Sequence, residues 1–278
     1  MEKTIDNVTL KYRQFLHNEE KSAATESKYL RDVKKFILWC GKQKITKSLV
    51  LLYKKELIEK HSPSSVNSIL SSLNSYFEFK GMHNLKTKML KIQRQIFAKT
   101  DRELTREEYI RLLEAAKKKN RRLYFLMQTV CSTGIRISEL KFITVEAINK
   151  GEATINCKGK MRLVMLPENL CKLLSVYVKE EKILKGSIFI TRNGKPLDRS
   201  NVFHEMKKLC DIAQVEPKKV FPHNLRHLFA RTYYSLQKDI VRLADILGHS
   251  SINTTRIYTM ESGEIHRTQI QMLGLLRC

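Results

Sequence analysis

The sequence predicts a mainly α-helical protein of two domains, with a small antiparallel β-sheet in the second. The first observation is the length, because 278 residues exceed the roughly 100–200 residues of one domain. The second is that apolar residues in the first hundred positions recur at helical spacing. The third is that residues 142–157 and 162–166 alternate and are rich in strand-forming side chains. We expect the domains to span residues 1–98 and 99–278.

The first domain is predicted to be a helical bundle. Helical spacing is clear between residues 29 and 40, at Tyr29, Val33, Phe36, Ile37 and Cys40. A second amphipathic helix follows a turn at residues 61–63, where Pro63 suits the first helical position and Ser62 the cap. Its outer face carries small uncharged residues, whereas a solvated face more usually carries Lys and Glu. Such a face allows close approach to a phosphate backbone or to another helix, and an ordinary solvated face is the alternative.

The second domain follows a basic, non-periodic stretch at residues 86–100, which we interpret as the linker. A capping box formed by Thr105 and Glu108 opens its first helix. A second helix begins at about Arg122 and ends at Gly134.

The rest of the second domain returns from strands to helices. Residues 158–160 form the predicted turn between the last two strands. Further helices are expected after Pro167, after Ser200 as a cap, after Pro222, and over residues 250–258.

The charge of the chain points to a polyanionic partner. The formal net charge is +24, of which the first 100 residues contribute +11 and the remainder +13. The excess is spread over both halves and is therefore not confined to a basic tail. A surface of this charge attracts polyanions, so nucleic acid is the favoured partner; the alternative is that the protein is merely rich in lysine.

Several other classes are excluded or disfavoured. The chain has no apolar run long enough to span a membrane and no secretory signal at its N-terminus. None of the six cysteines forms a C-x-x-C pair, so we interpret them as structural residues of a reducing, cytoplasmic environment.

The motifs G-x-G-x-x-G, P-loop and H-E-x-x-H are absent. His223 and His227 are four apart, but Asn224 stands where a metalloprotease has Glu, so we expect neither a metal nor a cofactor.

Arginine and histidine recur beside small turn residues in otherwise core-like segments. Arg136 lies in GIRISEL, His223 and Arg226 lie in PHNLRH, and His249 lies in LGHS. An arginine among core residues is costly unless it meets an anion. Two such arginines, if they converge, make a permanently charged cradle for one phosphate, as phosphoryl transfer requires.

These segments together resemble one family. The order GIRISEL, a lysine in a β-turn, PHNLRH, LGHS and TTRIYT is similar to the tyrosine recombinase/integrase family, in particular its Xer-like and transposon-integrase branches. The resemblance covers residues 105 to about 260, and the N-terminal helices are similar in layout to the family's SAM-like core-binding domain. It implies the two-domain recombinase architecture, with a helical core-binding domain and a mixed α/β catalytic domain.

The resemblance also implies roles for individual residues. Arg136, His223 and Arg226 would bind the scissile phosphate, His249 occupies the family's His/Trp position, and Tyr258 is the nucleophile. The general acid is Lys158 or Lys160; counting from the glycine favours Lys158, although the turn is one residue shorter than the family's usual pattern. The remaining candidate DNA contacts are Lys160, Arg162, Ser64, Ser65 and Ser68.

Simpler interpretations exist for some of the neighbouring residues. Tyr233 and Tyr234 are chemically equivalent nucleophiles, but their flanks indicate a packing face. Glu139 is interpreted as an i,i+3 partner that orients Arg136, and His227 as a structural histidine.

The resemblance implies a site-specific DNA recombinase that needs neither ATP nor metal and forms a 3′-phosphotyrosine intermediate. The alternatives are a type IB topoisomerase and a non-catalytic DNA-binding regulator. The expected partners are a double-stranded recombination site and copies of the same chain in a tetramer. Residues 264–278 are expected to dock on a neighbouring subunit, through the apolar positions Ile265, Met272, Leu273 and Leu276.

Overall fold

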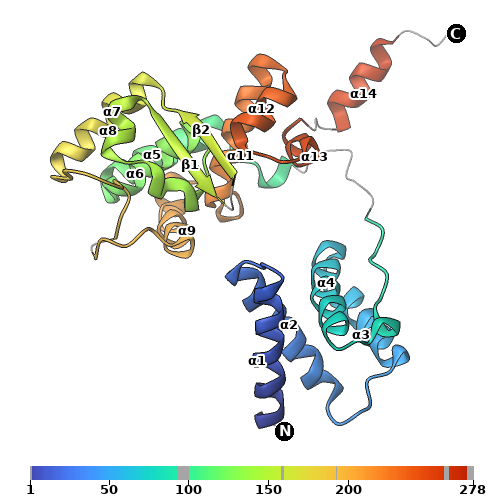
Figure 1. The fold of residues 1–278 in the computed structure, drawn as a ribbon. Helices are drawn as coiled ribbons and strands as arrows, with labels where there is room; N and C mark the ends of the chain where they lie inside the picture. The colour runs from blue at the N-terminus through green and yellow to red at the C-terminus, as the bar shows by residue number, and fades with distance from the viewer. Residues whose placement is uncertain (1, 93–99, 158–159, 192, 260–262, 274–278) are drawn as a thin grey trace, which may run out of the picture. The chain divides into compact units, whose positions relative to one another are not determined.

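A computed structural model describes residues 2–92, 100–157, 160–191, 193–259 and 263–273. Within these residues the chain is mainly helical with one two-stranded antiparallel sheet, which confirms the predicted fold class. The chain divides into two compact units, Met1–Arg94 and Gln95–Cys278 (Figure 1). The predicted domain boundary at residue 98 lies outside the described residues and stays a prediction.

The first unit is a bundle of helices whose ends are fixed by side-chain caps. Its elements are α1 (Glu2–Asn18), α2 (Ala23–Cys40), α3 (Lys47–Lys60), α4 (Pro63–Phe79) and the 3₁₀ turn η1 (His83–Leu85). The hydroxyls of Ser22, Thr46 and Ser62 each accept a hydrogen bond from a first-turn amide, and Pro63 occupies the first turn of α4 as predicted. The bundle core is aromatic and aliphatic, with Leu16, Phe36, Leu70 and Phe77 fully buried.

The serine-rich helix α4 packs one face on α2 and leaves the other in solvent. Ser72 is buried, and its hydroxyl donates to Asp32, which also accepts from Lys28 at 2.7 Å. Ser64, Ser65 and Ser68 have exposed side chains, in agreement with the predicted small outer face.

The second unit opens with local signals that the sequence carries. The first elements are η2 (Thr100–Arg102), α5 (Arg106–Lys119), α6 (Arg121–Thr133) and η3 (Ile137–Phe142). Thr105 and Glu108 form the predicted capping box at the start of α5. Helix α6 ends where predicted, at Gly134.

The predicted strand over residues 142–157 is wrong in its first part. Residues Val145–Lys150 form a helix, α7, before strand β1 (Glu152–Cys157) pairs with β2 (Lys160–Met165). Thr144 caps α7 by accepting from the Ala147 amide at 3.1 Å. Ala147 and Ile148 are both buried, and adjacent buried residues fit a helix face and not the alternation of a strand.

Helices complete the second unit. They are α8 (Glu168–Glu180), α9 (Arg199–Lys207), α10 (Cys210–Ala213), η4 (Pro217–Lys219), α11 (Pro222–Gln237), α12 (Ile240–Leu247), α13 (Ile252–Thr255), η5 (Arg256–Tyr258) and α14 (Gly263–Met272). Pro222 begins α11 as predicted, but Ser200 is not the cap of α9. Asp198 caps that helix and accepts from the Ser200 amide at 2.6 Å. None of the helices in the described residues is long and apolar enough to cross a membrane.

Two hydrophobic clusters position the functional residues of this unit. The larger one joins α5, α6 and the sheet to the start of α11, where Leu225 is fully buried. A smaller cluster of Ala230, Leu243, Leu247 and Tyr258 joins α11, α12 and η5. Helix α11 therefore packs on both clusters, with Leu225 in the larger one and Ala230 in the smaller one.

Candidate active site

Arg226 is the centre of the site. Its side chain is 1% exposed, and it donates to the carbonyl oxygens of Gly134 and, at 2.8 Å, Leu247. Burial and the nearby charge of Arg136 lower the pKa of Arg226 to about 10, so the guanidinium stays charged at neutral pH. Within the described residues its Nε–H is buried and has no acceptor. A buried charged donor without a partner is the kind of group that an anion satisfies.

The acceptors of Arg226 are carbonyls at helix ends, which lack partners inside their own helices. Gly134 ends α6 with φ +66°, and a Cβ there would lie 2.4 Å from the Phe229 ring. Gly248 ends α12 with φ +64°, and a Cβ there would lie 2.6 Å from the Arg162 side chain. Both positions therefore require glycine, for conformation and for space.

A buried carboxylate holds two further arginines. Glu139, 2% exposed, accepts from the Arg136 amide at 2.7 Å and from its guanidinium at 3.0 Å. The same carboxylate accepts from Arg162 at 2.7 Å, and Arg162 also donates to the Ile246 carbonyl at 2.9 Å. The predicted partnership of Arg136 and Glu139 is confirmed. The ion pair with Arg162 could not be foreseen, because nothing in the sequence places strand β2 beside η3.

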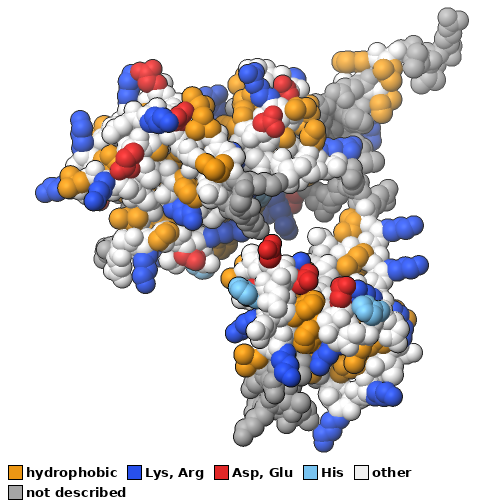
Figure 2. Space-filling view, in the orientation of Figure 1, with side chains coloured by type: hydrophobic (Ala, Val, Ile, Leu, Met, Phe, Trp, Pro, Cys, Tyr) orange, Lys and Arg blue, Asp and Glu red, His pale blue; other side chains and the backbone are white. Residues whose placement is uncertain are grey.

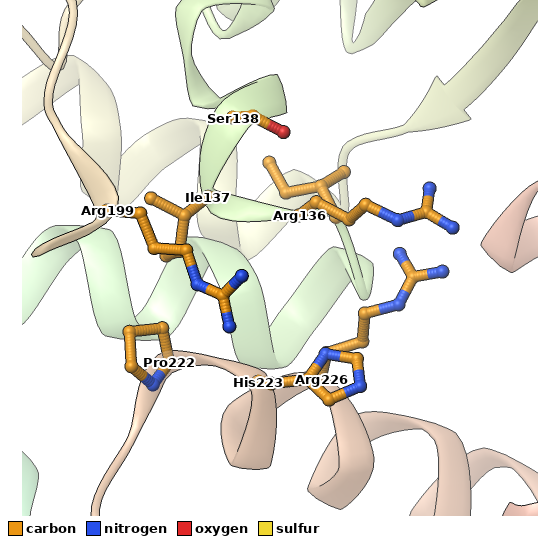
Figure 3. A pocket seen from close by; sticks show the side chains of 8 residues that line it. Arg136, Ile137, Ser138, Arg199, Pro222, His223 and Arg226 are labelled. Carbon is orange, nitrogen blue, oxygen red and sulfur yellow. The ribbon is translucent and has the colours of Figure 1, made fainter. Parts of the chain in front are cut away.

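The side chains of Arg136, His223 and Arg226 line one pocket of about 300 Å³. Arg199, at the start of α9, lines it as well, and sequence reasoning missed this residue. Figure 3 shows the three guanidinium groups and the His223 ring extending into the same space. The structure thus brings together three of the predicted catalytic residues and adds a third arginine, forming a cationic pocket suited to a phosphate.

The histidines of the site are neutral at pH 7. Burial and the charges of three nearby arginines lower the pKa of His223, and burial with Arg226 lowers that of His249 to about 4. The Nε2 of His249 lies 2.9 Å from an Arg226 nitrogen, which can only donate, so Nε2 is the acceptor. The proton of His249 is therefore on Nδ1, which donates to the Thr255 hydroxyl at 2.8 Å.

Tyr258 lies beside two of these histidines. It is 4% exposed, and its ring meets the His227 ring edge-on at 4.8 Å and lies nearly parallel to the His249 ring at 6.1 Å. His227 also contacts His223 at 4.6 Å between ring centroids, and burial lowers its pKa to about 4. His227 therefore links the pocket to the tyrosine. Tyr233 and Tyr234 pack against the cluster that holds Tyr258, and none of these three tyrosines is among the residues that line the pocket. The ring contacts with His227 and His249 are made by Tyr258.

The structure does not place every predicted residue. Lys158 lies outside the described residues, and Lys160 begins β2 with a side chain that is likewise not described. Ser64, Ser65 and Ser68 belong to the first unit, where they lie on helix α4. Among the described residues, no group of three or more His, Cys, Asp or Glu side chains is arranged to hold a metal ion.

Comparison with known families now identifies the chain. Residues 102–264 match the phage integrase family, and residues 10–82 match the N-terminal SAM-like domain of phage integrases. The chain belongs to the phage integrase family. The recognition of a tyrosine recombinase/integrase from the sequence motifs is therefore confirmed.

The chain is similar to Xer recombinases along nearly its whole length. It is 28% identical to the tyrosine recombinase XerA of Pyrococcus furiosus, over 99% of this chain and 97% of that protein. It is 26% identical to the tyrosine recombinase XerD of Staphylococcus haemolyticus, over 97% of each chain. Its fold is similar to a lambda integrase tetramer bound to a Holliday junction, with a TM-score of 0.69 at 19% identity, over 91% of this chain and 76% of that one.

Proposed function

We propose that this recombinase cleaves and rejoins DNA strands at specific sites through a covalent 3′-phosphotyrosine at Tyr258, without ATP or metal. One observation carries the proposal. The buried Arg226 lines the cationic pocket and holds His249, and the His249 ring lies nearly parallel to that of Tyr258. The family match and the Xer relatives support the same reaction class.

The arginines provide the electrostatic part of the mechanism. Arg136 and Arg226 donate hydrogen bonds to the non-bridging oxygens of the scissile phosphate and stabilise the charge that develops there. Arg226 reaches the pocket from a fixed position, because two main-chain carbonyls hold it before DNA arrives. Preorganised donors of this kind cost no reorganisation when the substrate reacts.

The covalent step transfers two protons. The Tyr258 oxygen forms a bond to phosphorus while the bond from phosphorus to the 5′ oxygen breaks. His223 is the neutral imidazole that lines the pocket, so we assign it as the acceptor of the phenol proton as well as a phosphate contact. Lys158 protonates the departing 5′ oxygen. Rejoining reverses the steps, with the 5′ hydroxyl of a new strand as nucleophile.

Both units contribute to DNA binding in this proposal. Lys and Arg side chains are spread over the visible face of each unit (Figure 2), in agreement with the excess positive charge of both halves of the sequence. In the first unit Ser64, Ser65 and Ser68 offer exposed hydroxyls on α4, and Lys160 and Arg162 of β2 contribute from the second. The proposal includes action in the cytoplasm.

The active assembly is proposed to be a tetramer on two synapsed DNA sites, with the C-terminal segment docked on a neighbouring subunit. Helix α14 supports this arrangement, because Ile270 and Met272 in its last turn and Leu273 directly after it are 61%, 78% and 63% exposed. Exposed apolar side chains on a short helix gain stability when another surface covers them. The similar lambda integrase structure is a tetramer on a Holliday junction.

Covalent trapping on nicked DNA tests the proposed function. In a nicked substrate the short cleaved strand diffuses away, so the protein remains attached to DNA. Tyr258→Phe is expected to bind DNA with unchanged affinity and to form no denaturant-resistant adduct, whereas the control Tyr234→Phe forms the adduct normally. An adduct that persists in Tyr258→Phe, or that disappears in Tyr234→Phe, contradicts the assignment.

A further inference from the structure

Arg199 lines the pocket but has no role in the mechanism above. It occupies the first position of α9, its side chain is exposed, and it extends into the pocket from the side of that helix (Figure 3). Within the described residues no carboxylate pairs with it. The adjacent Asp198 is already engaged, because its carboxylate caps the helix. Arg199 therefore presents a full positive charge to whatever enters the pocket.

The position of Arg199 is fixed by the packing of its helix. Val202 and Met206 anchor α9 in the core with 1% and 0% exposure. On the other side, Glu205 accepts from Asn120 and from Arg122, both at 3.0 Å. Only the Arg199 side chain itself needs to move to meet a ligand.

The contacts of the site show which ligand is left for Arg199. In the mechanism above, Arg136 and Arg226 contact the scissile phosphate, while Arg162 is held by Glu139 and is not among the residues that line the pocket. Two guanidinium groups supply enough donors for the two non-bridging oxygens of one phosphodiester. Arg199 is therefore the pocket arginine whose charge is left for another phosphate of the strand.

We propose that Arg199 binds the phosphate adjacent to the scissile one on the cleaved strand and so fixes the register of that strand in the pocket. The inference rests on the proposed function, which supplies the DNA strand. The charge of Arg199 also reaches the pocket itself, since it is one of the charges that lower the pKa of His223. Arg199 thus positions the strand, while the reacting atoms are contacted by Arg136 and Arg226.

The salt dependence of DNA binding tests the contact. Each phosphate neutralised by a protein contributes a slope of about −0.9 to log K against log salt concentration. On a short duplex of random sequence, Arg199→Ala is expected to make this slope shallower by about 0.9, whereas Arg199→Lys is expected to keep most of the wild-type slope. Arg106→Ala is the matched control, because Arg106 is also the exposed first residue of a helix but does not line the pocket. Equal slopes for Arg199→Ala and the wild type overturn the proposal.

A neutral methylphosphonate, placed singly at the scissile or a flanking position of a trapped site, locates the contact. At one of the two phosphates adjacent to the scissile one, this substitution is expected to weaken DNA binding by the wild type and to leave DNA binding by Arg199→Ala unchanged. If this coupling appears only at the scissile phosphate, the assignment to its neighbour is wrong. Failure of this proposal can be told apart from failure of the proposed function. If the wild type forms no adduct, the recombinase mechanism is refuted, whereas the binding slopes test Arg199 without any cleavage.

Discussion

Replacement of Glu139 by alanine tests whether the buried carboxylate positions the catalytic arginines. Glu139 accepts three hydrogen bonds from Arg136 and Arg162. Glu139→Ala removes all of them and leaves a cavity between η3 and β2. We expect a loss of both stability and cleavage, without a loss of DNA affinity, because the change also makes the protein more positive.

The size of the effect follows from the exposure of the two arginines. Removing one partner of a fully buried ion pair costs about 3–5 kcal/mol. The Arg136 side chain is 42% exposed and can turn to water, while Arg162 is 15% exposed and keeps its bond to the Ile246 carbonyl. The cost is therefore reduced to about 2–3 kcal/mol, which for a domain of this size lowers the Tm by roughly 5–10 °C. Without Glu139 the Arg136 guanidinium is no longer held in its orientation, and adduct formation is expected to slow about 100-fold.

Urea unfolding and single-turnover adduct formation at saturating nicked DNA measure the two effects. The control is Glu180→Ala, which breaks a surface pair between Glu180 and Arg121 that is 42% and 52% exposed. Such a pair contributes less than about 1 kcal/mol, and its removal should leave cleavage unchanged. Cleavage by Glu139→Ala at the wild-type rate would refute the positioning role, and equal stability losses in the two variants would refute the electrostatic reasoning.

Three further predictions concern the general acid, the C-terminus and pH. If Lys158 is the acid, a 5′-thiolate leaving group, which needs no protonation, restores cleavage in Lys158→Ala; rescue of Lys160→Ala instead would assign the other lysine. Deletion of residues 264–278 should leave half-site binding in gel-shift assays intact and abolish synapsis and strand exchange, so normal recombination by the truncated protein excludes docking in trans. His227 and His249 have pKa values of about 4 in the folded protein against an ordinary 6.5, so the unfolded chain takes up protons first as the pH falls. The free energy of unfolding should therefore be greatest above about pH 6.5 and fall towards pH 4, with a shallower fall in His227→Phe; a pH-independent urea midpoint contradicts this assignment.

Local signals in the sequence predicted several helix ends correctly. The capping box at Thr105, the proline at the start of α4 and the glycine after α6 are all found as predicted. Each depends on hydrogen bonds or dihedral angles within a few residues of the helix end. The same kind of signal was wrong at α9, where Asp198 and not Ser200 is the cap. The order of the motifs likewise identified the family, and the pocket brings together Arg136, His223 and Arg226 as expected.

Features that depend on tertiary contacts could not be predicted from the sequence. Residues 145–150 alternate enough to suggest a strand, but packing of both Ala147 and Ile148 favours a helix. Arg199 belongs to no motif, and only the docking of α9 brings it to the pocket. The contact of His227 with Tyr258 joins residues from α11 and η5, which no spacing rule connects.

The end of helix α12 has a consequence for how this site tolerates change. Its last two carbonyls, from Ile246 and Leu247, are the acceptors for Arg162 and Arg226. Main-chain oxygens are the same in every amino acid, so new side chains at 246 and 247 that preserve the packing leave both arginines supported. Gly248 is the opposite case, since a single methyl group there would collide with Arg162. The arginines therefore depend on the path of the backbone, and the least tolerant position at this helix end is the residue that has no side chain.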